Sequence, residues 1–154
     1  MAIQTFTISR DDRIYEAWPD VVLTKKGKLI CVFSECAHHK DRSYTRLVLS
    51  ESTDRGRTWS DKRPLTAGTN GMPYWNCARI SRLQDGRLVI VADKIAGKGE
   101  TNARNYLWFG DEDGQSWEGP IETAATGIVP DKLCELKKMG AGCYLLINEI
   151  RTVT

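Results

Sequence analysis

The sequence of 154 residues lacks the features that mark several large classes of protein. Its longest apolar runs, such as 88–92 and 144–147, are strand-sized and far shorter than the roughly 20 residues that span a bilayer. Its 22 basic and 20 acidic residues give a net charge of +2, which predicts no surface for nucleic acid or an anionic membrane. Residues 1–12 have neither a basic start nor an apolar core, so we expect no signal peptide and a cytoplasmic location.

Metal-binding and cofactor-binding patterns are also lacking. The five cysteines form no CxxC pair and leave one unpaired, which argues against a zinc site or a disulfide framework and favours buried thiols in a reducing compartment. The two histidines, His38 and His39, are adjacent, and adjacent side chains on a strand point in opposite directions. No glycine-rich loop joins a strand to a helix as a phosphate site requires. We therefore expect no metal and no cofactor.

Helical patterning is nearly absent, whereas hairpin patterning occurs three times. Segments beginning at Val21, Ile80 and Leu133 each contain an apolar run, a charged turn with glycine, and a second apolar run. Each segment predicts a β-hairpin. The turn glycines Gly27 and Gly86 are 59 residues apart, which indicates an internal repeat.

A second motif recurs with nearly the same period. Residues 52–59 read STDRGRTW and match the pattern S-x-D-x-G-x-T-W, a turn called the Asp-box. Its aspartate and hydroxyl groups accept backbone N–H bonds, its glycine supplies positive φ, and its tryptophan fills space between sheets. A weaker copy spans 110–117, with Gly110 in place of serine and Glu112 in place of aspartate.

These repeats predict an all-β fold of antiparallel four-stranded blades. We place blade 1 at about 18–67, blade 2 at about 76–124 and the start of blade 3 at about 130–154, with 1–10 as an outer strand. Such periods are typical of propellers, which need roughly four to eight blades to close a ring. The chain supplies about two and a half to three, so we expect an incomplete ring. Either a longer protein or association of two copies would complete it.

Residues able to bind a ligand are concentrated at one predicted end of the blades. The loop 36–43 contains both histidines, and the connection 69–76 adds Tyr74 and Trp75. Alignment of the three hairpins places charged residues at equivalent starts of the innermost strands, where they need partners or a ligand: Asp20, Arg79 and Lys132. A ligand site and mutual structural pairing both fit these charges.

In its two Asp-boxes and in the segments 18–23 and 31–35, the chain resembles the sialidase superfamily of six-bladed Asp-box (BNR-repeat) propellers. The resemblance implies a glycoside hydrolase of exo-sialidase type, or a fragment of one, acting on terminal acidic sugars of glycans. Two alternatives are a non-catalytic carbohydrate-binding propeller and a structural module that completes a ring by self-association. Whether the chain is an enzyme therefore stays open.

The resemblance also implies roles for individual residues. Asp41 follows the second strand at the distance of the family's acid/base aspartate, with His38 or His39 orienting it. The family's first arginine is replaced in the step Ala17-Trp18-Pro19, which leaves Arg13 or Arg79 to hold a sugar carboxylate. Tyr74 and Trp75 would form a stacking wall. The nucleophilic tyrosine and the remaining arginines would come from blades outside this sequence.

Overall fold

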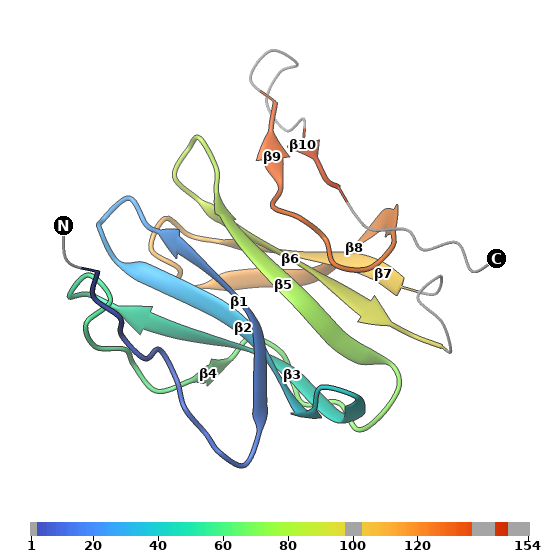
Figure 1. Cartoon of the computed structure of the whole chain (residues 1–154). Coiled ribbons are helices and arrows are strands. Elements are labelled where there is room, and N and C mark those ends of the chain that lie inside the picture. The colour runs from blue at the N-terminus through green and yellow to red at the C-terminus, as the bar shows by residue number, and fades with distance from the viewer. Residues whose placement is uncertain (1–2, 98–102, 137–143, 148–154) are drawn as a thin grey trace.

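Two four-stranded antiparallel sheets account for most of the structure, a computed structural model that describes residues 3–97, 103–136 and 144–147 (Figure 1). Sheet 1 has the strand order β1 (Tyr15–Leu23), β2 (Leu29–His38), β3 (Asp41–Ser52) and β4 (Arg63–Pro64). Sheet 2 has the order β5 (Tyr74–Arg82), β6 (Leu88–Ile95), β7 (Ala103–Gly110) and β8 (Trp117–Thr126). A hairpin of β9 (Cys134–Glu135) and β10 (Tyr144–Leu145) follows. None of these ranges contains a helix, so the predicted all-β class with four-stranded antiparallel sheets is confirmed.

The two sheets repeat each other in register as well as in strand order. Asp20 on β1 pairs with Val32 on β2, and the equivalent pair in sheet 2 is Arg79 with Val91. Both inner strands contain an irregularity before this pair, between Ala17 and Asp20 in β1 and, one position earlier in the repeat, between Trp75 and Ala78 in β5. Because the registers match from Asp20 to Leu23, the surroundings of these positions and their equivalents in sheet 2 can be compared directly.

The first Asp-box forms the turn that the sequence predicts. The Asp54 carboxylate accepts hydrogen bonds from the Thr58 backbone N–H at 2.9 Å, the Thr58 hydroxyl at 2.7 Å and the Ser52 hydroxyl at 2.8 Å. These bonds, led by the backbone N–H of Thr58, lower the pKa of Asp54 to about 2. The indole of Trp59 donates to the carbonyl oxygen of Gly56 at 3.0 Å, which folds the ring back over the turn.

In the second Asp-box the structure assigns the central carboxylate to a different residue than the sequence alignment does. Asp111, not Glu112, accepts the Ser116 backbone N–H and hydroxyl, both at 2.7 Å. Glu112 instead pairs with Lys25 of sheet 1 at 3.2 Å. The Trp117 indole donates to the Gly114 carbonyl oxygen at 3.1 Å, as its counterpart does in the first box. The carboxylate has moved one position along the turn while the tryptophan keeps its place.

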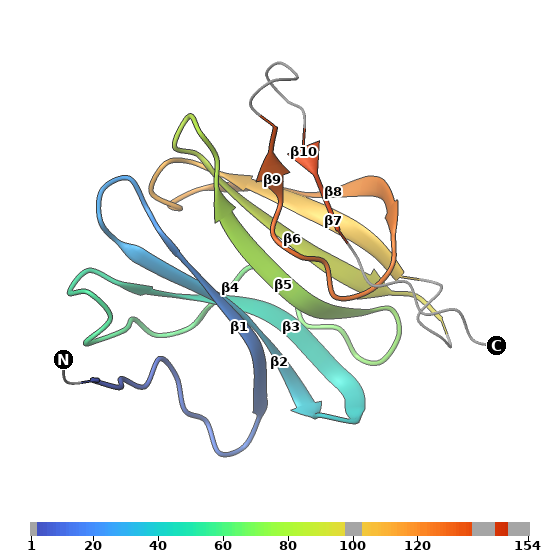
Figure 2. The ribbon, with the colours of Figure 1, turned by 45° about the horizontal axis from the view of Figure 1, so that its top comes forward.

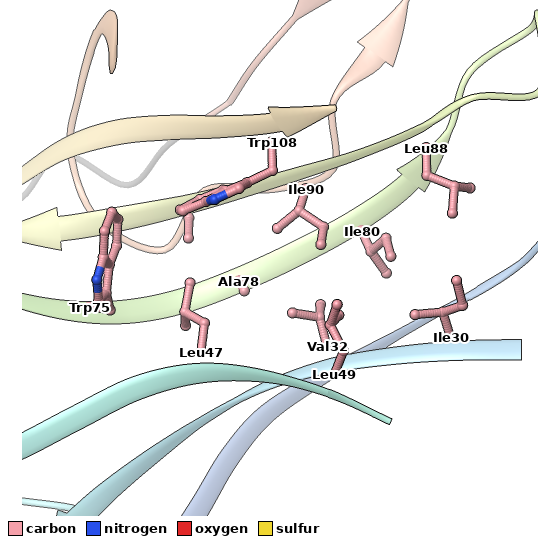
Figure 3. Packing of buried hydrophobic residues seen from close by; sticks show 11 residues of the cluster. Ile30, Val32, Leu47, Leu49, Trp75, Ala78, Ile80, Leu88, Ile90 and Trp108 are labelled. Atoms are coloured by element: carbon pink, nitrogen blue, oxygen red, sulfur yellow. The ribbon is translucent and has the colours of Figure 1, made fainter. Parts of the chain in front are cut away.

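The main hydrophobic core lies between the two sheets (Figure 3). On strands, alternate residues face the same side, and Ile30, Val32, Leu47 and Leu49 of sheet 1 all face sheet 2. Residues of sheet 2 that face them are Trp75, Ala78, Ile80, Leu88, Ile90, Ala92 and Trp108. At one end of this core, the Arg63 guanidinium donates to the Gly114 carbonyl oxygen at 2.6 Å. The second Asp-box therefore joins the sheets as well as closing a turn.

The stack continues beyond both sheets (Figure 2). On the side of sheet 2 away from sheet 1, Val89 and Leu83 pack with Leu133, Tyr144 and Leu146 of the β9–β10 hairpin region. On the side of sheet 1 away from sheet 2, Cys31, Phe33 and Val48 pack with Trp59 and with Ile8 of the N-terminal segment. Residues 3–13 lie along this side without forming a strand, unlike the outer strand that the sequence predicts.

Several strands are longer than the sequence predicts. The expected loop 36–43 is mostly strand, because His38 pairs with Asp41 and only residues 39–40 form the turn. In sheet 2, the pairing of β6 with β7 extends to Ile95 and Ala103. Across the described ranges, no helix has the length and apolar character needed to cross a membrane.

Candidate functional site

Six side chains gather where β1 begins, where β2 turns into β3 and where β5 begins. We call this group the aromatic cluster; it contains Tyr15, Trp18, His38, His39, Arg42 and Tyr74. Both histidines and Tyr15 are exposed, and the other members are half-buried. The sequence predicted that the β2–β3 connection and the connection before β5 share one end of the sheets, and the contact of Arg42 with Tyr74 confirms this.

Arg42 is the centre of the aromatic cluster. Its guanidinium carbon lies 4.9 Å from the ring centroid of Trp18 and 5.9 Å from that of Tyr74. One guanidinium nitrogen donates to the His38 carbonyl oxygen at 2.8 Å and lies 3.1 Å from Cys36 Sγ. These contacts hold the guanidinium in place at a cluster whose other members remain accessible. Cation–π contacts of this kind are worth about 0.5–2 kcal/mol.

Trp18 reaches the cluster because β1 is irregular there. The register shift between Ala17 and Asp20 removes Trp18 from the regular pairing, and its φ of 52° lies in the left-handed region. A bulge of this kind redirects a side chain out of the regular alternation. The Trp18 ring then lies 6.3 Å from the ring of His39, while Tyr15 lies 6.1 Å from His38 and 5.6 Å from His39.

Asp41 borders the cluster at the start of β3 and is exposed. Its carboxylate accepts the backbone N–H of Ser43 at 2.8 Å. This backbone bond, followed by the Ser43 hydroxyl and the positive charges nearby, lowers the pKa of Asp41. A general acid needs a raised pKa at neutral pH, so Asp41 in this environment is an ionised turn residue.

Arg13 and Trp75 lie apart from the aromatic cluster. Arg13 is on the loop before β1, 90% exposed, and its Nε lies 3.1 Å from Asp11 Oδ1. Trp75, predicted as part of a stacking wall, is only 5% exposed. Its ring packs in the core at 5.2 Å from both Tyr106 and Trp108, with Lys94 Nζ 4.6 Å from its centroid. The rings that lie in the aromatic cluster are instead those of Tyr15, Trp18 and Tyr74.

The inner-strand charges favour structural pairing, one of the two alternatives that the sequence leaves open. Asp20 Oδ1 accepts from Lys132 Nζ at 3.0 Å, and Oδ2 accepts the Ile80 backbone N–H at 2.9 Å. Arg79, which holds the position equivalent to Asp20, donates to the carbonyl oxygen of Ala78 at 3.1 Å. Asp20 thereby links the inner strands of both sheets to the segment before β9.

A buried polar pair lies on the far side of sheet 2, and sequence patterning gave no sign of it. Asp93 on β6 and Asn105 on β7 are cross-strand partners, and both are 0% exposed. Asp93 Oδ2 accepts from Asn76 Nδ2 at 3.0 Å, and Asn105 Nδ2 donates to the Gly127 carbonyl oxygen at 2.8 Å. Burial raises the pKa of Asp93 to about 6, against the opposing effect of the Asn76 bond.

The described residues include no group of three or more histidine, cysteine, aspartate or glutamate side chains arranged to hold a metal ion. The aromatic cluster presents a fixed guanidinium, two imidazoles and partly exposed aromatic rings, and the ionised carboxylate of Asp41 borders it. Such a group can bind an anionic ligand that has an apolar face.

The fold defines the class of the protein as all-β, built from stacked four-stranded antiparallel sheets. Neither a scan against protein-family models nor a search of curated proteins finds a match. Among solved structures, the chain is similar to a protein of unknown function from Dyadobacter fermentans DSM 18053, with 21% identity and a TM-score of 0.59. The match covers 75% of this chain and 38% of that chain, so this chain spans well under half of the other protein's length. At this identity the similarity concerns the fold alone.

Proposed function

We propose that the chain is part of a sialidase-like Asp-box β-propeller and that its aromatic cluster binds an acidic carbohydrate. The propeller is supported by the equivalent registers of the two sheets and by the continuation of the stack into β9–β10. The length of the structural neighbour is also consistent with a propeller. The part matched by this chain, two sheets and their flanking segments, is 38% of that chain, so the rest of that chain is long enough for further sheets, within the roughly four to eight blades of known propellers.

The contact of Arg42 with Trp18 is the observation that carries the binding proposal. A guanidinium presents a planar fork of donors that matches a carboxylate, and its charge persists across the physiological pH range. The neighbouring rings of Trp18, Tyr15 and Tyr74 offer apolar surface with polar edges, on which the C–H face of a sugar can stack. Carboxylate and sugar ring are the two parts of an acidic monosaccharide.

Binding is favoured over hydrolysis by the state of Asp41. Glycoside hydrolysis usually needs one carboxyl group held protonated and a second group as nucleophile or base. The hydrogen bond from Ser43 lowers the pKa of Asp41, so its carboxylate is ionised at neutral pH. The tyrosine nucleophile implied by the family resemblance would come from other blades. We therefore propose a binding role for this chain by itself.

Hydrolysis is the second candidate, and the position of Asp41 beside the aromatic cluster favours it. Further blades or a bound glycan could desolvate this carboxyl group and raise its pKa. A fluorogenic sialoside tests this candidate. Release of the fluorophore by the wild type, lost in Asp41→Asn, would support an enzyme, whereas equal release by both proteins would exclude Asp41 as the acid.

The binding proposal is tested with the methyl α-glycoside of N-acetylneuraminic acid, followed by tryptophan fluorescence and by calorimetry. We expect Arg42→Ala to weaken binding about tenfold or more, since a hydrogen bond to a charged group is worth roughly 1.5–3 kcal/mol. Arg57→Ala is the matched control, because Arg57 is an exposed arginine on the first Asp-box turn. Methyl β-galactoside, which has no carboxylate, should bind at least tenfold more weakly than the sialoside. Equal affinity of wild type and Arg42→Ala would refute the site.

A further inference from the structure

The chain between β8 and β9 turns back over the side of sheet 2 that faces away from sheet 1 (Figure 2). Its first residues, 127–129, lie at the end of sheet 2 where Tyr74 begins β5, and we call them the support segment. Ile128 is buried in a small core, against which Tyr74 and Val129 pack. One ring of the aromatic cluster therefore rests on a part of the chain that lies far from it in sequence.

The backbone of the support segment is strained. Gly127 has a φ of 117° and Val129 a φ of 50°, and both values lie in the left-handed region. Glycine adopts such values readily, but for a β-branched residue they are costly. A strained residue keeps its conformation only where the contacts around it determine that conformation. The support segment therefore needs contacts that hold it in place.

Asn105 on β7 holds the support segment from inside sheet 2. Its Nδ2 donates to the carbonyl oxygen of Gly127 at 2.8 Å, and the Asn105 side chain is 0% exposed. The backbone N–H of Gly127 donates to the carbonyl oxygen of Ala103 on the same strand at 3.3 Å. Both backbone groups of Gly127 are thus bonded to β7. Because the Asn105 amide is buried, water does not compete for its bond.

The contribution of the Asn105 amide is direction more than stability. Its Oδ1 is buried and has no hydrogen-bond partner among the residues that the structure describes. An unpaired buried oxygen costs free energy, which offsets part of the gain from the bond at Nδ2. The remaining effect of the amide is a fixed orientation of the Gly127 carbonyl group, and with it of the support segment.

We propose that Asn105 is a positioning residue for the aromatic cluster, because it fixes the support segment and the support segment holds the Tyr74 ring beside Arg42. The proposal rests on the proposed binding of an acidic sugar at this cluster. Tyr74 is its member from sheet 2, whereas Arg42 and Trp18 belong to sheet 1. The Tyr74 ring centroid lies 5.9 Å from the guanidinium carbon of Arg42. A shift of the support segment would therefore move one wall of the site and leave the guanidinium in place.

Calorimetry with the methyl α-glycoside of N-acetylneuraminic acid tests the positioning role on the purified full chain. Tyr74→Ala and Asn105→Ala should each weaken binding roughly two- to tenfold, since a stacked aromatic ring contributes about this much. The double variant should bind no more weakly than Tyr74→Ala, because Asn105 acts through Tyr74. Effects of the two substitutions that multiply, or full affinity in Asn105→Ala, would overturn the proposal.

Leu88→Ala is the matched control for loss of stability. Leu88 is also 0% exposed, but it lies at the other end of sheet 2, where β6 begins. Its variant should be less stable than the wild type and should bind the sialoside with unchanged affinity. Circular dichroism checks that each variant is folded at the temperature of the titration.

A second measurement needs no ligand. The NMR resonance of the Arg42 Nε–H group depends on the ring currents of the aromatic side chains around it. Tyr74→Ala gives the change in this resonance that loss of the ring causes, and Asn105→Ala should change it in the same direction. Leu88→Ala should leave it unchanged. An unchanged resonance in Asn105→Ala would refute the positioning role.

The two measurements separate failure of the positioning role from failure of the proposed function. If the wild type does not bind the sialoside, the proposed function fails, and the Arg42 resonance still decides whether Asn105 positions Tyr74. If Asn105→Ala does not fold, Ile128→Val takes its place, because it removes one methylene from the core on which Tyr74 packs. It should shift the Arg42 resonance in the same direction by a smaller amount, and no shift would overturn the proposal.

Discussion

Replacing the buried Asp93 with asparagine should remove a pH dependence from the stability of this protein. The Asp93 side chain is 0% exposed, and its Oδ1 is without a hydrogen-bond partner in the described part of the chain. The cross-strand neighbour Asn105 also has no partner for its Oδ1 in the described part of the chain, while its amide nitrogen donates to the Gly127 carbonyl oxygen. Two acceptor oxygens on neighbouring strands thus have no hydrogen-bond donor. Protonation of Asp93 would turn one of these groups into a donor.

The magnitude follows from the raised pKa of Asp93. Burial raises it from 3.8 to about 6, a difference of about 2 pH units, which corresponds to about 3 kcal/mol. The folded state binds the proton more tightly than the unfolded state. The favourable contribution of this group is therefore complete below about pH 4 and is lost as pH rises through about 6. The nearby positive charge of Arg79 acts in the opposite direction, but burial outweighs it.

Urea unfolding of wild type and Asp93→Asn between pH 4 and 8 measures the effect. The free energy of unfolding of the wild type should fall by about 3 kcal/mol relative to that of the variant over this range. Other titrating groups are common to both proteins and cancel in the difference. Asp85→Asn is a control with almost no slope over this range, because the Arg87 side chain lowers the pKa of the exposed Asp85 below 3.8, so its contribution is lost only below about pH 4. A difference between wild type and Asp93→Asn that stays constant with pH would refute the reasoning.

Three further predictions concern the turns and the cysteines. Gly114→Ala should be less stable than Gly27→Ala by roughly 1–3 kcal/mol in urea unfolding. Both glycines have a positive φ, 66° at Gly114 and 88° at Gly27. Only at Gly114 would the new methyl group collide with another side chain, that of Ile30. Equal unfolding midpoints would contradict the tight contact between the second Asp-box and sheet 1. Asp111→Ala should lower the free energy of unfolding by about 1–2 kcal/mol. Glu112→Ala loses only an exposed ion pair and should lower it by less than about 1 kcal/mol. A larger effect of Glu112→Ala would indicate that Glu112 is the central carboxylate of the turn. At neutral pH a thiol reagent should label exposed Cys134 faster than Cys31 and Cys77, because burial raises the pKa of the latter two to about 12. Mass spectrometry of the labelled peptides measures this, and rapid labelling of Cys77 in folded protein would disprove its burial.

The local structure and its repetition could be predicted from the order of the residues alone. Alternating apolar residues around Gly27 and Gly86 require hairpins, and residues 52–59 contain every donor and acceptor of the first Asp-box turn. The predicted hairpins and four-stranded antiparallel sheets are therefore found in the structure, with strand ends extended by a few residues. Short-range hydrogen bonds and the two-residue alternation of strands decide these features, and both are visible within a dozen residues of sequence.

The partners of the polar and aromatic side chains, in contrast, could not be predicted, because they depend on the packing of one sheet on another. Trp75 and Tyr74 are neighbours in sequence, yet one packs in the core and the other lies at the aromatic cluster. Arg42 contacts Trp18 because β1 is irregular at that position. Asp93 is buried because the segment after sheet 2 packs on that side of the sheet. These outcomes depend on contacts between strands far apart in the chain. A local pattern states that a residue faces one side of a strand, but the packing of another sheet on that side decides whether it is buried, paired or free to bind.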